Sequence, residues 1–143
     1  MKTLFHFISY VQSFKLIIII LFFCVSCSMS YEKAIVSRVE RNLGDCLAPY
    51  DEIVIIPGAG CTGCISNAER YFLKNVSNNK KLFVFTYNIS QKSLFMRLGR
   101  ENLIRENVII DIDDRFYVSH HHDNIYPYII IIDDGRIIAV KEL

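Results

Sequence analysis

The hydrophobic positions of this chain fall into short apolar runs that alternate with longer amphipathic segments. β-Branched and aromatic residues dominate four runs, at 52–56, 82–87, 107–112 and 128–133. Continuous runs of this length are typical of central strands that are covered on both faces. Apolar positions spaced three or four residues apart predict helices over 31–47 and 64–76, and a third helix from Ser90 that Gly99 kinks or splits.

The last part of the sequence predicts a β-hairpin. Asp134-Gly135 is a strong two-residue turn signal, and the β-branched segment 136–140 would return beside the run 128–133. Strand, helix, strand, helix and strand followed by a hairpin indicate an α/β fold in which helices pack on a mixed sheet.

The first 26 residues follow a different pattern. They contain Lys2 and Lys15 but no acidic residue, and they include the uninterrupted apolar run 16–25. This run is about half as long as a membrane-spanning helix requires, but it fits the central region of a secretory signal peptide. We therefore expect residues 1–26 to direct export. The alternative is an N-terminal helix that stays attached as an anchor.

The end of this segment resembles the lipobox of bacterial lipoproteins, whose cysteine is lipidated and becomes the first residue. Val25-Ser26-Cys27 suits the last three positions of that motif, whereas Cys24 stands where leucine is usual. The resemblance implies cleavage before Cys27 and attachment to a membrane through lipid rather than through a spanning helix. An ordinary signal peptide with two incidental cysteines is the alternative.

Length and charge restrict the remaining possibilities. A chain of 143 residues suits one domain. Sixteen Lys+Arg against fifteen Asp+Glu leave no basic excess, which argues against a nucleic-acid partner. A hydrophobic content of 52% excludes a disordered chain.

The candidate chemistry lies in the segment Cys61-Thr-Gly-Cys64, between a predicted strand and a predicted helix. The start of a helix presents free N–H groups and partial positive charge, which stabilise a thiolate. Cys61 would be the attacking thiolate and Cys64 the resolving thiol. The alternatives are a structural cysteine pair or half of a zinc site, for which Cys46 and the histidines 120–122 would be the remaining ligands. We expect Cys46 to be buried and the histidines to lie in a solvated loop.

From about Asp51 to Lys141 the chain resembles the thioredoxin superfamily, most closely its exported, membrane-tethered thiol–disulfide oxidoreductases. In that family a strand leads to a Cys-x-x-Cys helix, and a cis-proline loop that faces the disulfide precedes the two last strands. Pro127 holds the cis-proline position here, and Tyr126 precedes it, where the family's backbone pairs with a substrate peptide. Gly60 stands before the first cysteine, where tryptophan is usual.

The resemblance implies a three-layer thioredoxin-like sandwich with a mixed central sheet that lacks the usual C-terminal helix. The helix predicted over 31–47 would cover the face left bare. The expected organisation is a signal peptide at 1–26, a linker and helix at 27–50, and the thioredoxin-like domain at 51–143.

The expected function is disulfide exchange in the bacterial cell envelope, on the periplasmic side of a membrane. Cys61 and Cys64 would be catalytic, while Gly60, Tyr126 and Pro127 would bind the substrate. No cofactor is expected; the partners would be a protein disulfide, an electron-donor protein and the membrane that holds the lipid on Cys27. Two alternatives are a non-catalytic lipoprotein that binds a protein partner and a metal-handling chaperone that uses the two cysteines and a histidine.

Overall fold

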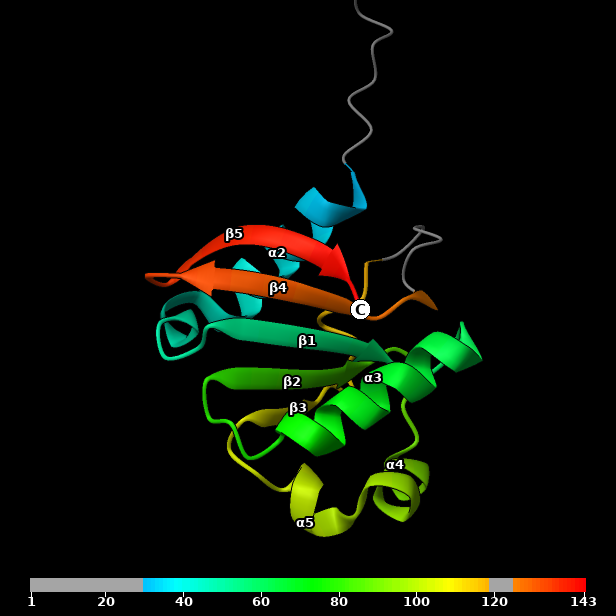
Figure 1. Ribbon diagram of the computed structural model, residues 1–143. Helices are drawn as coiled ribbons and strands as arrows, with labels where there is room; N and C mark the ends of the chain where they lie inside the picture. Colours follow the sequence, from blue (N-terminus) through cyan, green and yellow to red (C-terminus); the bar gives the residue numbers. More distant parts are fainter. Residues whose placement is uncertain (1–29, 119–124) are drawn as a thin grey trace, which may run out of the picture.

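The computed structural model describes residues 30–118 and 125–143 (Figure 1). The predicted signal peptide, Cys24, Cys27 and the three histidines at 120–122 lie outside these residues. No helix of the described part is both long enough and apolar enough to cross a membrane. The helices are α2 (Tyr31–Leu43), η1 (Gly44–Leu47, a 3₁₀ turn), α3 (Thr62–Asn75), α4 (Gln91–Leu98) and α5 (Arg100–Leu103). The strands are β1 (Glu52–Pro57), β2 (Lys81–Thr86), β3 (Val108–Ile110), β4 (Tyr128–Asp133) and β5 (Arg136–Glu142).

The five strands form one mixed sheet in the order β3-β2-β1-β4-β5. β1, β2 and β3 are parallel, whereas β4 runs antiparallel to β1 and β5 antiparallel to β4. The carboxyl ends of the three parallel strands therefore share one edge of the sheet, and the loop that carries the two cysteines begins there. The predicted α/β class and mixed sheet are confirmed.

Helices cover both faces of the sheet (Figure 1). Successive residues of β1 alternate between two cores, which is the consequence of a strand's two-residue period. Ile53 and Ile55 pack in the core that includes residues of α2, and Val54 and Ile56 pack in the core that includes residues of α3, α4 and α5. The helix predicted over 31–47 thus lies on the sheet face opposite α3, as expected.

The predicted N-terminal helix ends earlier than its apolar spacing suggested. The α-helix stops at Leu43, where Gly44 has a φ of 48°, and the chain continues as the turn η1. Cys46 lies in this turn and is exposed, so the expectation that it is buried was wrong. The turn rotates the chain so that its neighbour Leu47, which is 5% exposed, enters the core instead.

The hairpin between β4 and β5 forms at the predicted turn. Asp134 and Gly135 have φ values of 47° and 72°, as a two-residue turn of the hairpin type requires. The strand register shifts between Ile131 and Ile132, which leaves Ile138 as an extra, 62% exposed residue on the outermost strand. Such a bulge twists an edge strand and makes it a poorer template for another chain.

Candidate functional site

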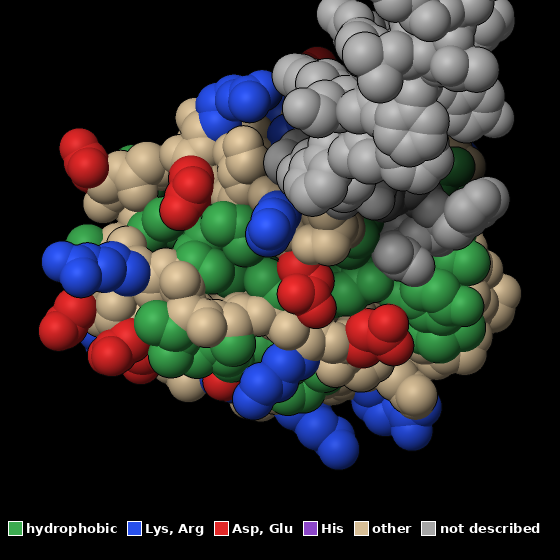
Figure 2. All heavy atoms as spheres, turned by 90° about the horizontal axis from the view of Figure 1, so that it is seen from above, with side chains coloured by type: hydrophobic (Ala, Val, Ile, Leu, Met, Phe, Trp, Pro, Cys, Tyr) green, Lys and Arg blue, Asp and Glu red, His purple; other side chains and the backbone are tan. Residues whose placement is uncertain are grey.

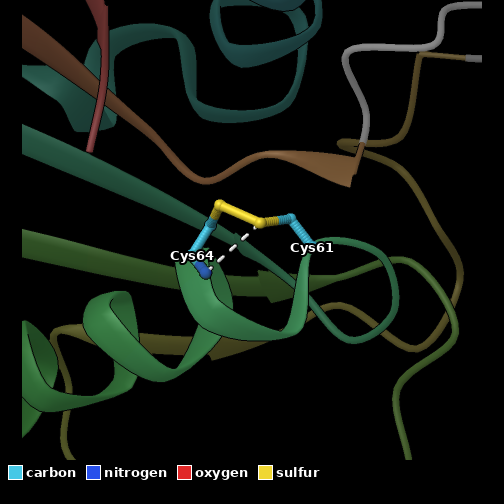
Figure 3. Close-up of a disulfide and its surroundings, with 2 residues drawn as sticks. All are labelled: Cys61 and Cys64. Carbon is cyan, nitrogen blue, oxygen red and sulfur yellow. Dashed lines mark hydrogen bonds between the residues drawn. A yellow bond between two sulfur atoms is a disulfide. The ribbon is translucent and has the colours of Figure 1, made fainter.

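Cys61 and Cys64 form a disulfide at the start of α3, with their Cα atoms 5.3 Å apart (Figure 3). Cys61 is the N-cap residue of the helix, and its Sγ accepts a hydrogen bond from the backbone N–H of Cys64 at 3.4 Å. Both cysteines are partly buried, and Thr62 and Gly63 between them are exposed. A sulfur at this position faces N–H groups that have no partner within the helix, so the local field favours its thiolate form after reduction.

The segment that leads into β4 passes directly beside the disulfide loop (Figure 3). The backbone N–H of Cys61 donates to the carbonyl oxygen of Ile125 at 3.2 Å. Gly60 has a φ of 135°, and a Cβ placed on it would lie 2.5 Å from the Cβ of Ile125 and 2.7 Å from its carbonyl oxygen. Glycine is required at this position both by the backbone conformation and by the close approach of the second segment.

The loop after β2 supports the disulfide loop from another direction. The N–H of Gly58 lies 2.8 Å from the carbonyl oxygen of Thr86 and 2.9 Å from that of Tyr87. A Cβ on Gly58 would come within 2.8 Å of the Tyr87 and Asn88 carbonyl oxygens and of the Ile89 side chain. The cysteines are thus held by two neighbouring segments, mainly through backbone contacts.

A buried carboxylate holds the loop after β3 against the same edge of the sheet. Asp111 is fully buried and accepts hydrogen bonds from the Thr86 hydroxyl and from the N–H groups of Arg115 and Phe116 at 2.8–3.0 Å. The Arg115 guanidinium lies 3.5 Å from the same carboxylate. This arrangement satisfies the buried charge.

An aromatic pair extends this support to the loop after β2. Tyr87 and Tyr117 stack with their ring centroids 4.6 Å apart. The N–H of Tyr87 donates to the Asp114 carboxylate at 3.0 Å. Tyr87, Asn88 and Asp114 all have φ values between 52° and 57°, a region that non-glycine residues adopt rarely. The loops that surround the disulfide loop are therefore themselves tied together.

Tyr126 and Pro127, two of the three residues expected to bind substrate, pack toward the core of the protein. The described residues contain no cis peptide bond, so the bond before Pro127 is trans and the cis-proline expectation was wrong for this structure. A trans bond is the favoured form for any X-Pro pair unless the surroundings impose the other. Pro127 is buried and its carbonyl accepts from the N–H of Leu143, while Tyr126 packs against the core on the α2 side.

The residue that touches the cysteine loop is Ile125, which the sequence did not single out. It lies two positions before Pro127. Tyr126 was expected to pair with a substrate peptide rather than with the cysteine loop, and that expectation stays a prediction. No pattern in the sequence marks a residue whose contribution is a backbone carbonyl, because any amino acid supplies one. Gly60, by contrast, was expected at the site, and the structure places it against Ile125.

Metal ligands do not gather among the described residues. No group of three or more His, Cys, Asp or Glu side chains there is arranged to hold a metal ion. Cys61 and Cys64 are joined in a disulfide, so neither offers a thiolate to a metal ion in this state. The histidines that would complete a metal site lie outside the residues described.

The opposite edge of the sheet carries a charged cluster. Glu52 and Lys81, the first residues of β1 and β2, form an ion pair, and the Tyr71 hydroxyl donates to Glu52 at 2.9 Å. Partial burial alone would raise the pKa of Glu52, but the hydrogen bonds from Lys81 and Tyr71 and the charge of Lys81 hold this pKa below its ordinary value. Burial alone would lower the pKa of Lys81, and the same interactions raise it instead.

Comparison of the chain with family models, with curated proteins and with solved structures found no match.

Proposed function

We propose that this protein is a thiol–disulfide oxidoreductase with a thioredoxin-like fold and a Cys61–Cys64 active site. The observation that carries the proposal is the position of the pair: it caps a helix that follows a central strand, and its sulfurs can bond within one turn. The N-cap position and the two exposed residues between the cysteines favour a redox role over a structural one, because the helix start stabilises a thiolate and the exposed turn leaves the pair within reach of a substrate. The mixed sheet ending in a hairpin after Pro127 is compatible with the fold.

The proposed reaction begins with the reduced pair. The Cys61 thiolate attacks one sulfur of a substrate disulfide, breaks that bond and forms a mixed disulfide, while the other substrate sulfur leaves and takes a proton from solvent. Cys64 loses its proton and attacks Cys61 Sγ, which releases the second substrate thiol and forms the intramolecular disulfide. The substrate gains two electrons and the protein loses two. A dithiol donor reverses these steps on the protein and regenerates its reduced form.

We further propose that the protein acts in the bacterial cell envelope, where disulfide exchange is physiologically useful. Support comes from the signal-like segment 1–26 and the lipobox-like cysteine at position 27. Lipidation of Cys27 would hold the domain at a membrane surface with its protein partners. Replacement of Cys27 by alanine should abolish the incorporation of labelled palmitate into the protein; incorporation that persists in this variant would contradict lipidation of Cys27.

The test of the activity is reduction of a disulfide-bonded protein by dithiothreitol, with and without this protein. The wild type should accelerate the reaction, and Cys61→Ser should return it to the uncatalysed rate. Cys64→Ser, reduced and freed of dithiothreitol before it is mixed with the substrate, should accumulate a mixed disulfide that mass spectrometry detects. Cys46→Ser is the matched control, because Cys46 is exposed in η1 and outside the disulfide, and it should retain full activity. Equal rates for the wild type and Cys61→Ser would reject the proposal.

A further inference from the structure

A lipid on Cys27 would leave almost no chain between the membrane and the folded domain. Only two residues separate Cys27 from Ser30, the N-cap residue of α2. Because an extended chain spans at most about 3.6 Å per residue, the Cα atoms of Cys27 and Ser30 are no more than about 11 Å apart. The start of α2 must therefore stay close to the lipid headgroups.

The start of α2 lies beside β5, the outermost strand of the sheet (Figure 1). Two adjoining grooves of about 230 Å³ and 340 Å³ run between them. The grooves are lined by residues 30–33 and Val36 on one side and by Tyr128, residues 137–140 and Glu142 on the other. Both grooves include Glu32 and Val140, so they form one continuous surface. We call the residues that line it the anchor face.

The anchor face combines exposed apolar side chains with long basic ones. Ile138 is 62% exposed, and Val36 and the neighbours of Ile138 on β5 are partly exposed. Lys33 lines the same groove, and the exposed Arg136 and Lys141 flank it on β5. Figure 2 looks onto this side of the molecule and shows apolar side chains between interspersed basic and acidic ones. Lysine and arginine can lay their aliphatic stems on apolar surface while their charges stay among headgroups, so this composition suits a lipid–water interface.

The shape of β5 favours lipid over another polypeptide as the occupant of this face. The register shift between Ile131 and Ile132 makes Ile138 a bulge residue, and a bulge hinders the addition of a further strand at an edge. A lipid surface makes no demand on strand register. It needs apolar side chains that can enter the headgroup layer, and Ile138 supplies one.

Charge alone would not hold this face on a membrane. Lys33, Arg136 and Lys141 are opposed by Glu32 and Glu142, which leaves an excess of one positive charge. One basic residue near anionic headgroups contributes only about 1 kcal/mol. The lipid on Cys27 would instead keep the face at a high local concentration beside the bilayer, so weak contacts are sufficient to orient the domain.

The same end of α2 is connected to the disulfide. Tyr31 packs against Tyr128, with ring centroids 4.9 Å apart, and Tyr128 pairs with Ile55 near the carboxyl end of β1. Three residues before Tyr128, the Ile125 carbonyl accepts from the N–H of Cys61. The tethered end of the domain and the disulfide loop therefore lie toward the same edge of the sheet. A domain that rests on the anchor face holds Cys61 at a fixed height above the lipid.

We infer that the anchor face lies against the headgroups of the membrane, with the Ile138 side chain inserted among them, and that this contact orients the domain. The inference rests on the proposed lipidation of Cys27. Burial of the exposed isoleucine removes apolar surface from water, and the basic side chains around it keep their charges at the headgroups. The β3 edge of the sheet then faces away from the membrane.

The experiment places a fluorophore on either edge of the sheet. The lipidated, oxidised protein is reconstituted in vesicles of phosphatidylethanolamine and phosphatidylglycerol. Cys46→Ser removes the exposed thiol, and the disulfide protects Cys61 and Cys64, so one introduced cysteine takes the label. Ile138→Cys is the test position. Ile104→Cys is the matched control, because Ile104 is 69% exposed and lies shortly before β3, at the other edge of the sheet.

Lipids that carry a nitroxide on the headgroup report which label touches the membrane. They should quench the label at position 138 by at least about half, as expected for a side chain inserted at the headgroup level. They should quench the label at position 104 by less than about a tenth, because four strand spacings, about 19 Å, separate β5 from β3. Iodide in the water should quench the two labels in the opposite order.

Each other result overturns the inference in a recognisable way. Equal quenching of the two labels by the nitroxide lipids would mean that the domain has no preferred orientation. A label at position 138 that the lipids do not quench, but that more protein per vesicle shields from iodide, would assign the face to a second copy of the chain. In both cases the lipid anchor stands.

Mass spectrometry of the same sample shows whether Cys27 carries lipid. Its absence would reject the anchor and this inference together. The oxidoreductase proposal would survive, because the comparison of the wild type with Cys61→Ser tests it without a membrane.

Discussion

The two ends of the parallel strands are built in opposite ways. At the amino ends, Glu52 and Lys81 face each other across the strand register and are joined by an ion pair. At the carboxyl ends, Pro57 and Thr86 occupy the equivalent positions, and the loops beyond them are joined by backbone hydrogen bonds, glycine contacts and the buried Asp111 carboxylate. A pair of charges tolerates small movements and partial exposure to water. Backbone contacts at a glycine tolerate little movement, because the two segments approach too closely for a side chain to fit between them.

The largest effect is expected where the carboxyl end is most crowded. Gly60→Val combines an unfavourable φ with a clash against Ile125, so it should lower the free energy of unfolding by about 4 kcal/mol, as measured by urea denaturation. Gly63→Ala is the control, because a Cβ at Gly63 meets nothing within 4 Å. It should stabilise the protein by up to about 1 kcal/mol. Equal effects of the two substitutions would show that Ile125 does not constrain the loop.

The second prediction concerns the buried carboxylate of Asp111, which also lies at the carboxyl ends of the parallel strands. Asp111→Ala leaves the Thr86 hydroxyl and two backbone N–H groups without their acceptor, and it should cost about 3 kcal/mol in the same assay. Asp113→Ala removes an exposed carboxylate of the same loop and should change stability by less than about 0.5 kcal/mol. A cost for Asp111→Ala no greater than that of its control would mean that the carboxylate network contributes little.

The amino end should be more tolerant. Lys81→Met should reduce stability by about 1 kcal/mol, because the Glu52–Lys81 pair remains partly open to water. A double-mutant cycle with Glu52→Gln isolates the coupling between the two side chains. Coupling as large as the loss caused by Asp111→Ala would remove the contrast between the two ends.

The smallest expected effect is the loss of unfolding free energy at acidic pH through Glu52. The pKa of Glu52 in the folded protein lies below its ordinary value of 4.5, so the stabilisation from this group is present above pH 4.5 and is lost as the pH falls toward the folded-state pKa. The loss should be below about 1 kcal/mol. In Glu52→Gln, the difference in unfolding free energy between pH 6 and pH 3.5 should be smaller than in the wild type. A larger difference would mean that the sign of this linkage is wrong.

Much of the fold could be predicted because its signals are local. The buried strands β1, β2 and β4 are continuous apolar runs, Gly99 separates α4 from α5 as expected, and Asp134-Gly135 forms the hairpin turn. The boundaries were less accurate. α3 begins at Thr62 rather than Cys64, because Cys61 itself caps the helix, and β3 is limited to Val108–Ile110 because its pairing with β2 covers only that length.

The cysteine pair of the candidate site was visible in the sequence, but its surroundings were not. Spacing predicts a helix start beside Cys61 and Cys64, because both signals are adjacent in the chain. The contact with Ile125 joins residues more than sixty positions apart through a backbone carbonyl, and Asp111 accepts from the hydroxyl of Thr86, which lies 25 positions earlier in the chain. Long-range contacts of this kind depend on the complete topology, so no local pattern reveals them.

The N-cap position of Cys61 links the chemistry of the sulfur to the stability of the first turn of α3. The Sγ that accepts from the Cys64 N–H is a neutral disulfide sulfur in the oxidised protein and becomes an anionic acceptor when the thiolate forms. A charged acceptor makes a stronger cap. In the reduced protein, amide hydrogen exchange in the first turn of α3, corrected for its intrinsic pH dependence, should therefore slow when the Cys61 thiol becomes a thiolate, so that local fraying of the helix reports the ionisation of the sulfur.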